Sequence, residues 1–235
     1  MRKVLQRRGA RIGLALAVGA AVLVVAGIAA ALAFVGGSPQ KAASGPVSAP
    51  TLVATKDSTL FTIDASGSEA TFTLHEVLFG QPNTVVGKTS SVAGQILVNR
   101  TNAAQSQVGE IKVDMSTLVT DSDLRNRQLQ NHILETSDPS NQYATFVATS
   151  LKGLPSSVTV GQPVPFRIVG NLTIHGVTRS VTFDAQVTEQ SATELTGQAQ
   201  TTIRYADFGI SIPQVPTVTG VSDTVVLALT FTAKA

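Results

Sequence analysis

Residues that could carry out catalysis or bind a metal ion are few and widely separated in this chain. The 235 residues include no cysteine, which excludes disulfide scaffolds, thiolate metal sites and a cysteine nucleophile. The three histidines, His75, His132 and His175, are far apart in sequence and belong to no zinc-binding pattern. Gly220-Val221-Ser222 lacks the closing glycine of a hydrolase nucleophile elbow. The sequence therefore predicts no catalytic residue, no metal site and no cofactor.

Charged side chains near the expected element ends fit structural roles. Asp121 and Asp123 lie at the start of a predicted helix, where carboxylates cap backbone N–H groups. We expect Arg204 and Asp207 to form an ion pair at a strand end, worth about 0–1 kcal/mol if exposed. None of these residues supports an enzyme, so a hydrolase or isomerase is kept only as a third hypothesis.

The distribution of charge argues against nucleic-acid binding. The chain has 17 Lys and Arg against 15 Asp and Glu, but five of the basic residues lie in the first eleven positions. The remainder therefore carries 12 basic and 15 acidic groups, a net charge of 12 − 15 = −3. Phosphate binding requires clustered Lys and Arg, so we expect no nucleic-acid partner.

The N-terminal region predicts a membrane anchor. From Ile12 to Val35 run 24 uncharged, mainly apolar residues, which as a helix would span roughly 36 Å, enough to cross a bilayer. Because this run is longer than the apolar core of a cleavable signal peptide, we assign residues 1–35 to a basic cytoplasmic end and an uncleaved signal-anchor helix. Ala31-Leu32-Ala33 resembles a cleavage site and keeps secretion open as the alternative. In both cases the positive flank places the rest of the chain outside the cytoplasm.

Residues 36–57 are rich in Gly, Ser, Pro and Ala and have little hydrophobic periodicity, which predicts a flexible linker. Residues 58–235 form the expected folded domain, in which apolar and polar residues alternate. Such alternation is typical of antiparallel strands with one face on a core and the other in water. The expected strands are 58–64, 69–78, 84–98 (with a break allowed), 107–115, 143–152, 163–174, 177–188, 194–205 and 224–233.

Two further signals complete the predicted fold. His175-Gly176 joins two strands so closely that a hairpin is expected. Residues 120–135 contain no Gly or Pro and space Leu124, Leu129, Ile133 and Leu134 for one side of a single helix. Many strands, one helix and no alternation of strands with helices predict an all-β fold, a closed antiparallel barrel of about eight strands.

The interior of such a barrel is either filled by side chains or wide enough for one slender ligand. The chain has no Trp, 9 Phe and 2 Tyr, so few bulky groups are available to fill the centre. Small residues in the inward phase favour a cavity, although small and large residues also alternate in packed barrels. These small residues are Ala144, Ala148, Gly170, Ala185, Gly197 and Ala199.

Two segments of the folded domain resemble the YceI-like family. The segment from Gly170 to Phe183, which contains Leu172-Thr173-Ile174-His175-Gly176-Val177-Thr178-Arg179, is similar to the hairpin motif of that family. The segment Ile203-Arg204-Tyr205-Ala206-Asp207-Phe208-Gly209-Ile210 resembles a second family motif, with a longer spacer. Ser116 to Thr120 with Arg125, and then Tyr143 to Phe146, resemble its helix and following strand, so the similarity covers about residues 58–233.

This resemblance implies an extended, lipocalin-like barrel that is exported from the cytoplasm. Members of the family hold a polyisoprenoid chain in an elongated apolar tunnel, and the resemblance brings no catalytic residues. Ser180 replaces a proline that often follows the basic residue of the hairpin, and Glu76 to Pro82 differ from the usual pattern. These departures leave the identity of the ligand open.

The favoured hypothesis is therefore a membrane-tethered binding protein, outside the cytoplasm, for a polyisoprenoid lipid or a quinone-like ligand. The alternative is a ligand-free structural or interaction module of the cell envelope. The chain itself leaves the oligomeric state open, with a homodimer as one candidate. We expect Arg179, in the inward phase of its strand, to contact a ligand head group at a barrel mouth. The predicted lining consists of Phe72, Leu74, Ile96, Ile111, Val113, Phe146, Phe166, Ile168, Phe183 and Ile203.

Overall fold

The structure, a computed structural model, describes residues 46–213 and 215–235. The predicted signal-anchor helix, its basic flank and the first part of the predicted linker lie outside these described residues. Within them, no helix has both the length and the apolar character needed to span a bilayer. Residues 46–57, the described part of the predicted linker, contain neither helix nor strand.

The described residues form one antiparallel sheet, in which some neighbouring strands are consecutive in the chain and others are far apart in sequence. The alternation of apolar and polar residues explains these strands, since each buries one face and exposes the other. The strands are β1 (Ser58–Ile63), β2 (Glu69–Leu78), β3 (Gln81–Thr89), β4 (Val92–Ala93), β5 (Gln95–Asn99), β6 (Gln107–Val108), β7 (Ile111–Asp114), β8 (Tyr143–Lys152), β9 (Pro163–Ile174), β10 (Val177–Ser191), β11 (Glu194–Arg204), β12 (Val218–Thr219) and β13 (Thr224–Lys234).

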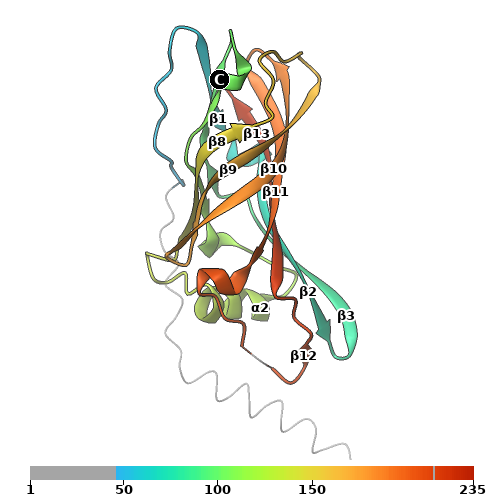
Figure 1. Cartoon of the computed structure of the whole chain (residues 1–235). Helices are drawn as coiled ribbons and strands as arrows, with labels where there is room; N and C mark the ends of the chain where they lie inside the picture. Colours follow the sequence, from blue (N-terminus) through green and yellow to red (C-terminus); the bar gives the residue numbers. More distant parts are fainter. Residues whose placement is uncertain (1–45, 214) are drawn as a thin grey trace, which may run out of the picture. The chain divides into compact units, whose positions relative to one another are not determined.

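The sheet is strongly curled (Figure 1). Its main path has the order β4-β7-β8-β9-β10-β11-β13-β1-β5-β6. β13 pairs with β11 on one side, while its other side is divided between β2, which pairs with residues 226–230, and β1, which pairs with residues 233–234. β2 pairs with β3, and β3 leads through two residues into β4, at the far end of the path. The chain thus brings the two ends of the sheet together, in agreement with a lipocalin-like barrel.

The predicted strands agree closely with this sheet. The ranges expected for β2, β8 and β9 match residue for residue, and His175-Gly176 forms the predicted hairpin between β9 and β10. The run 84–98 is divided into three strands, first by residues 90–91 and then by Gly94, whose carbonyl accepts a hydrogen bond from the Ile63 amide (3.0 Å). The run 107–115 is divided at Gly109, whose amide donates to the Gln95 carbonyl (2.9 Å).

The predicted helix is present in a shorter and less regular form. It consists of α2 (Asp123–Gln128) and a π-helical turn, η4 (Leu129–Ile133). The N-cap is Ser122, which accepts from the Arg125 amide, whereas Asp121 pairs with the Arg125 side chain, so the capping role expected of Asp121 was wrong. Leu129 is buried, but Leu124 is 59% exposed. Residues five apart differ by about 140° around an α-helix, so these two leucines cannot share a face.

Four short 3-10 turns were not predicted. Three of them begin at a side-chain cap: Asp64, Asn102 and Asp114 each accept from the backbone amide two residues later. Asp114 has no exposed surface, and its carboxylate also accepts from the amide of Gln142 (3.1 Å). The turns are η1 (Ala65–Gly67), η2 (Ala103–Gln105), η3 (Met115–Thr117) and η5 (Tyr205–Phe208).

Buried apolar side chains form two clusters on the inner face of the sheet. The large core extends from η4 and η5 to β8, β9 and β11, and includes Leu129, Phe146 and Phe208. The small core lies where β1 meets β13, around Phe61 and Ala233, both with no exposed surface. We call the end of the sheet that carries α2, η5 and β12 the helix end (Figure 1).

Candidate functional site

The strand register places most of the predicted lining residues on one concave face. Phe183 lies opposite Ile168, and Phe146 lies opposite Leu172, which is 4% exposed. Directly opposed residues of antiparallel strands point to the same side of a sheet. The residues that the sequence alternation predicted to point inward therefore lie on the face that packs against the large core.

Eight of the ten predicted lining residues meet in the large core. Phe146, Ile168 and Ile203 are buried there, and the other five are partly buried against it: Phe72, Leu74, Ile111, Phe166 and Phe183. Ile96 and Val113 pack instead against the small core. The structure thus brings eight residues together and leaves two at the other cluster. Their contact with a ligand stays a prediction.

Several of these inward side chains retain accessible surface. Phe72, Phe166 and Phe183 are only partly buried, and so are Ala199 and Leu227 on the same face. By contrast, Leu195 and Phe231 of the small core are 2% and 6% exposed. Protein interiors are normally close-packed, so an inward apolar side chain keeps accessible surface only where other side chains do not fill the space beside it. The middle of the concave face is therefore an accessible apolar surface.

Two of the small residues that favoured a cavity have another role. A Cβ atom added to Gly170 would lie 2.5 Å from Cζ of Phe146, and one added to Gly197 would lie 2.7 Å from Cζ of Phe231. These glycines therefore accommodate phenyl rings that lie against the sheet. At these two positions a small residue therefore does not indicate a cavity, because a phenyl ring fills the space beside it.

Two phenylalanines also meet edge to face in the centre of the site. The ring centroids of Phe146 and Phe183 are 4.9 Å apart, with an angle of 68° between the ring planes. This T-shaped arrangement is favourable for aromatic rings and fixes both against the wall formed by β8 and β10.

Arg179 lies near the helix end of the same face. It is paired with buried Leu172, which confirms its inward phase, yet its side chain is exposed. Its guanidinium donates to the backbone carbonyl of the preceding Thr178 (3.0 Å). This position is compatible with the predicted contact to a ligand head group.

A polar cluster at the helix end was missed by sequence reasoning. Glu76 of β2 is on the same face as Phe72 and Leu74, and its side chain is only 9% exposed. Its carboxylate accepts from Asn83 (2.9 Å) and from Arg125 of α2 (3.3 Å). A carboxylate in the inward phase of a strand was the signal that could have revealed it, because a buried charge requires a partner.

The ion pair expected between Arg204 and Asp207 is not formed. Arg204 instead pairs with Asp223, with Nη2 and Oδ2 2.8 Å apart. The register of β11 with β13 places Arg204 opposite Thr224, directly beside Asp223. Among the histidines, His75 contacts Thr84 (3.0 Å) and His175 contacts Glu135 (3.3 Å), which fits hydrogen-bonding roles at the surface.

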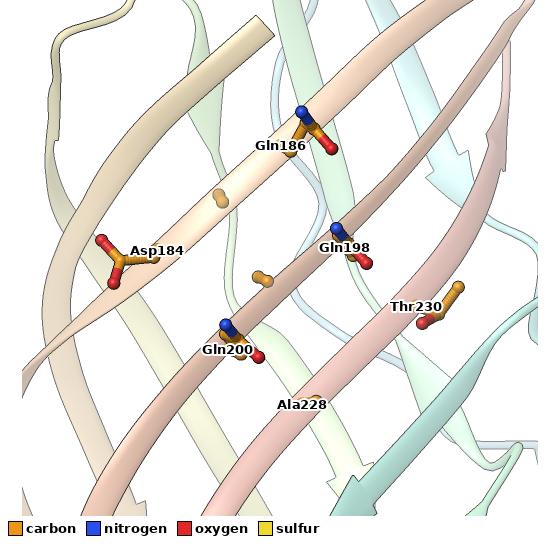
Figure 2. Close-up of a pocket in the computed structure, with 8 residues that line it drawn as sticks. Asp184, Gln186, Gln198, Gln200, Ala228 and Thr230 are labelled. Carbon is orange, nitrogen blue, oxygen red and sulfur yellow. The ribbon is translucent and has the colours of Figure 1, made fainter. Parts of the chain in front are cut away.

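A shallow groove with a volume of about 270 Å³ lies on the opposite, outer face of the sheet (Figure 2). Amide, carboxylate and hydroxyl side chains from β10, β11 and β13 surround it. This polar lining does not suit a long apolar molecule, unlike the concave face. Its labelled residues are Asp184, Gln186, Gln198, Gln200, Ala228 and Thr230.

Comparisons with known proteins agree with this architecture. One similar structure is a polyisoprenoid binding domain from Saccharophagus degradans implicated in plant cell wall breakdown. It is 18% identical, with a TM-score of 0.55, and the alignment covers 74% of this chain and 98% of that domain. Another is BcnA from Burkholderia cenocepacia, also 18% identical, with a TM-score of 0.57 and coverage of 73% and 99%. At this level of identity the two structures establish the fold alone.

The comparison with curated proteins found no match. A model of the YceI-like domain family matches residues 61–233, which include every strand from β2 to β12, the second half of β1 and all but the last residue of β13. The match covers well over half of the chain and confirms the resemblance seen in its motifs. This protein belongs to the YceI-like family.

Proposed function

We propose that this protein binds a long apolar molecule, a polyisoprenoid lipid or an isoprenoid quinone, on the concave face of its curled sheet. It acts as a carrier or sensor of that molecule and catalyses no reaction. The observation that carries the proposal is the accessible apolar surface formed by Phe72, Phe166, Phe183 and their neighbours.

The energetics of apolar burial suit such a ligand. Each buried CH₂ group contributes about 0.8 kcal/mol, so a repeated isoprenoid chain gains affinity along its whole length. No charged partner is needed for the chain itself. Arg179, exposed near the helix end, is available for a polar or anionic head group.

The fold relationship supports the same ligand class. One structure of similar fold is described as a polyisoprenoid binding domain, and this chain shares its architecture over most of that domain. At 18% identity the ligand class is a proposal for this chain, and it depends on the apolar residues of its own concave face.

The proposed location follows from the sequence. The basic N-terminus and the apolar run from Ile12 to Val35 support a signal anchor, with the barrel outside the cytoplasm on a linker. A tether would keep the barrel close to the bilayer in which isoprenoid lipids dissolve.

Mass spectrometry of lipids retained by the intact chain tests this function. The full-length protein is extracted from its own membrane in mild detergent, and bound lipids are identified after stringent washing. We expect a stoichiometric isoprenoid species that is absent from a matched membrane protein purified in the same way. A chain that carries no isoprenoid and also fails to bind added isoprenoid quinone in titration would contradict the proposal and favour the ligand-free envelope module.

A further inference from the structure

The turn between β2 and β3 contains a bulky residue in a conformation that disfavours it. Phe79 and Gly80 form a two-residue connection with φ of 49° and 79°. Positive φ at both positions is the pattern of type I′ hairpin turns, which prefer Asn, Asp or Gly at the first position. Phe79 is nevertheless 75% exposed, so its ring gains little from packing within the described chain. A strained and exposed aromatic residue points to a contact outside the barrel.

Two more exposed apolar side chains belong to elements at the same end of the sheet. The Phe79 amide donates to the carbonyl of Thr217 (2.9 Å), which places the loop containing Val215 beside the hairpin tip. α2, which carries Leu124, is joined to β2 by the ion pair between Arg125 and Glu76. We call Phe79 (75% exposed), Leu124 (59%) and Val215 (45%) the tip surface. Figure 1 shows their elements together at the helix end.

The described chain before β1 runs along the sheet away from the helix end. The Leu52 amide donates to the side chain of Gln95 (2.8 Å), and Ser58 pairs with Asn99. β5 is antiparallel to β1, which is antiparallel to β13, so β5 and β13 run in the same direction, away from the helix end. From residue 52 to 58 the chain thus moves away from the helix end (Figure 1). Residue 52 therefore lies nearer the helix end than Ser58 does.

The charges near the tip surface indicate what kind of surface it fits. Asp121 and Asp123 balance Arg125 and Arg127 on and beside α2. A balanced set offers no net attraction to a strongly charged protein or to anionic lipid. Exposed Phe and Leu side chains are instead the groups that insert into the boundary between lipid head groups and acyl chains.

We propose that the tip surface docks on a lipid bilayer, with Phe79 inserted below the head groups. The proposal rests on the proposed function, since a barrel that takes up an isoprenoid must receive it from a bilayer. Docking at the helix end holds Arg179 and the polar cluster of Glu76 close to the lipid surface. Insertion of about 5–10 Å is typical for such peripheral contacts.

The chain contains no Trp, so a single introduced Trp reports its own position. We compare F79W with V160W in the full-length chain reconstituted into phosphatidylcholine vesicles. Val160 is 57% exposed in the loop between β8 and β9, at the opposite end from the β9–β10 hairpin. Phosphatidylcholine brominated on its acyl chains quenches Trp only when the indole reaches the apolar layer. We expect F79W to be quenched several-fold more strongly than V160W, with emission shifted to shorter wavelength.

L124W provides a second position, on the exposed side of α2. Equal quenching of F79W, L124W and V160W overturns docking. A shift to shorter wavelength without bromine quenching also overturns it, because a protein partner or a second copy then covers the tip.

Isoprenoid quinone retained by the same vesicle-bound samples is measured in parallel. None of the three substituted residues faces the concave surface, so each variant should retain the ligand. If the variants retain the quinone but all three Trp residues are quenched equally, docking is rejected and the proposed function stands. If F79W is quenched more strongly than V160W but no quinone is retained, the proposed function is rejected and docking stands.

Discussion

The ring of Phe72 on β2 lies directly over the backbone of Gly87, its cross-strand partner on β3. A Cβ atom added to Gly87 would lie only 2.0 Å from Cε1 of that ring. Gly170 with Phe146 and Gly197 with Phe231 repeat the arrangement in other parts of the sheet. The rings thus lie along the wall of the curled sheet, and glycine is required opposite them because any side chain would occupy the same space.

Replacement of Gly87 by Ala should therefore destabilise the barrel. The added methyl group must displace the Phe72 ring, and overpacking of this kind typically costs about 1–3 kcal/mol. Urea unfolding of the full-length chain in mild detergent, followed by circular dichroism, measures the change in free energy of unfolding.

The same substitution in a Phe72→Leu background supplies the control. Leu has no ring over Gly87, so the additional cost of Gly87→Ala should be smaller than in the wild-type chain. Equal costs in the two backgrounds would show that the contact between ring and glycine is not the cause.

Ala199→Leu should reduce ligand binding while it leaves the fold intact. Ala199 is partly buried on the concave face, opposite Ala185 on β10, and a larger side chain there fills space proposed for the ligand. We expect a loss of retained isoprenoid with little change in the urea midpoint. Ala228→Leu, on the outer face beside Gln200, is the matched control and should retain the ligand. If Ala199→Leu instead lowers stability and does not affect binding, the interior is packed.

Removal of Arg125 should loosen α2 from the sheet. The side chain of Glu76 is 9% exposed, and without Arg125 its carboxylate keeps only the hydrogen bond from Asn83. A buried polar group that loses its hydrogen-bond partner typically costs about 1–3 kcal/mol, and a charged group costs more. Hydrogen exchange should show faster exchange in α2 of Arg125→Ala than in wild type. The double variant Arg125→Ala with Glu76→Gln should recover part of the stability lost in Arg125→Ala. If the stability changes of the two single variants simply add in the double variant, the two residues are not coupled.

Acid should weaken the contact between Asp64 and the C-terminal strand. The Lys234 ammonium, 2.6 Å from Oδ2, and then the hydroxyl and amide of Ser66 lower the pKa of Asp64 from 3.8 to about 2. Because the folded pKa lies below the unfolded value, ionised Asp64 stabilises the fold above pH 3.8, and this contribution is lost as the pH falls towards 2. The stability difference between wild type and Asp64→Asn should accordingly shrink across that window.

Lys234→Met removes the same hydrogen bond from the other side and should give the same dependence on pH. If the difference in free energy of unfolding between wild type and variant stays constant from neutral pH to pH 2, Asp64 is ruled out as the titrating group.

Local patterns predicted most of the strands because each was read from its own alternation. Residues 69–78, 143–152 and 163–174 needed no knowledge of their neighbours. The prediction that Leu124 shares a face with Leu129 failed because residues five apart differ by about 140° around an α-helix, so Leu124 faces solvent when Leu129 is buried. The ion pair of Arg204 was assigned to the wrong carboxylate, because Asp223 reaches it through pairing of strands that are twenty residues apart in sequence.

The sequence by itself determined the all-β class, the inward and outward phases, the family and the predicted membrane anchor. These properties depend on the order of residues along the chain, and residues separated by one position already define a strand face. Only the tertiary structure decided that Phe72 crosses Gly87, that Arg125 reaches Glu76 and that Phe79 stands exposed at the helix end. Such contacts depend on the register between distant strands and on closure of the curled sheet, which no local period encodes.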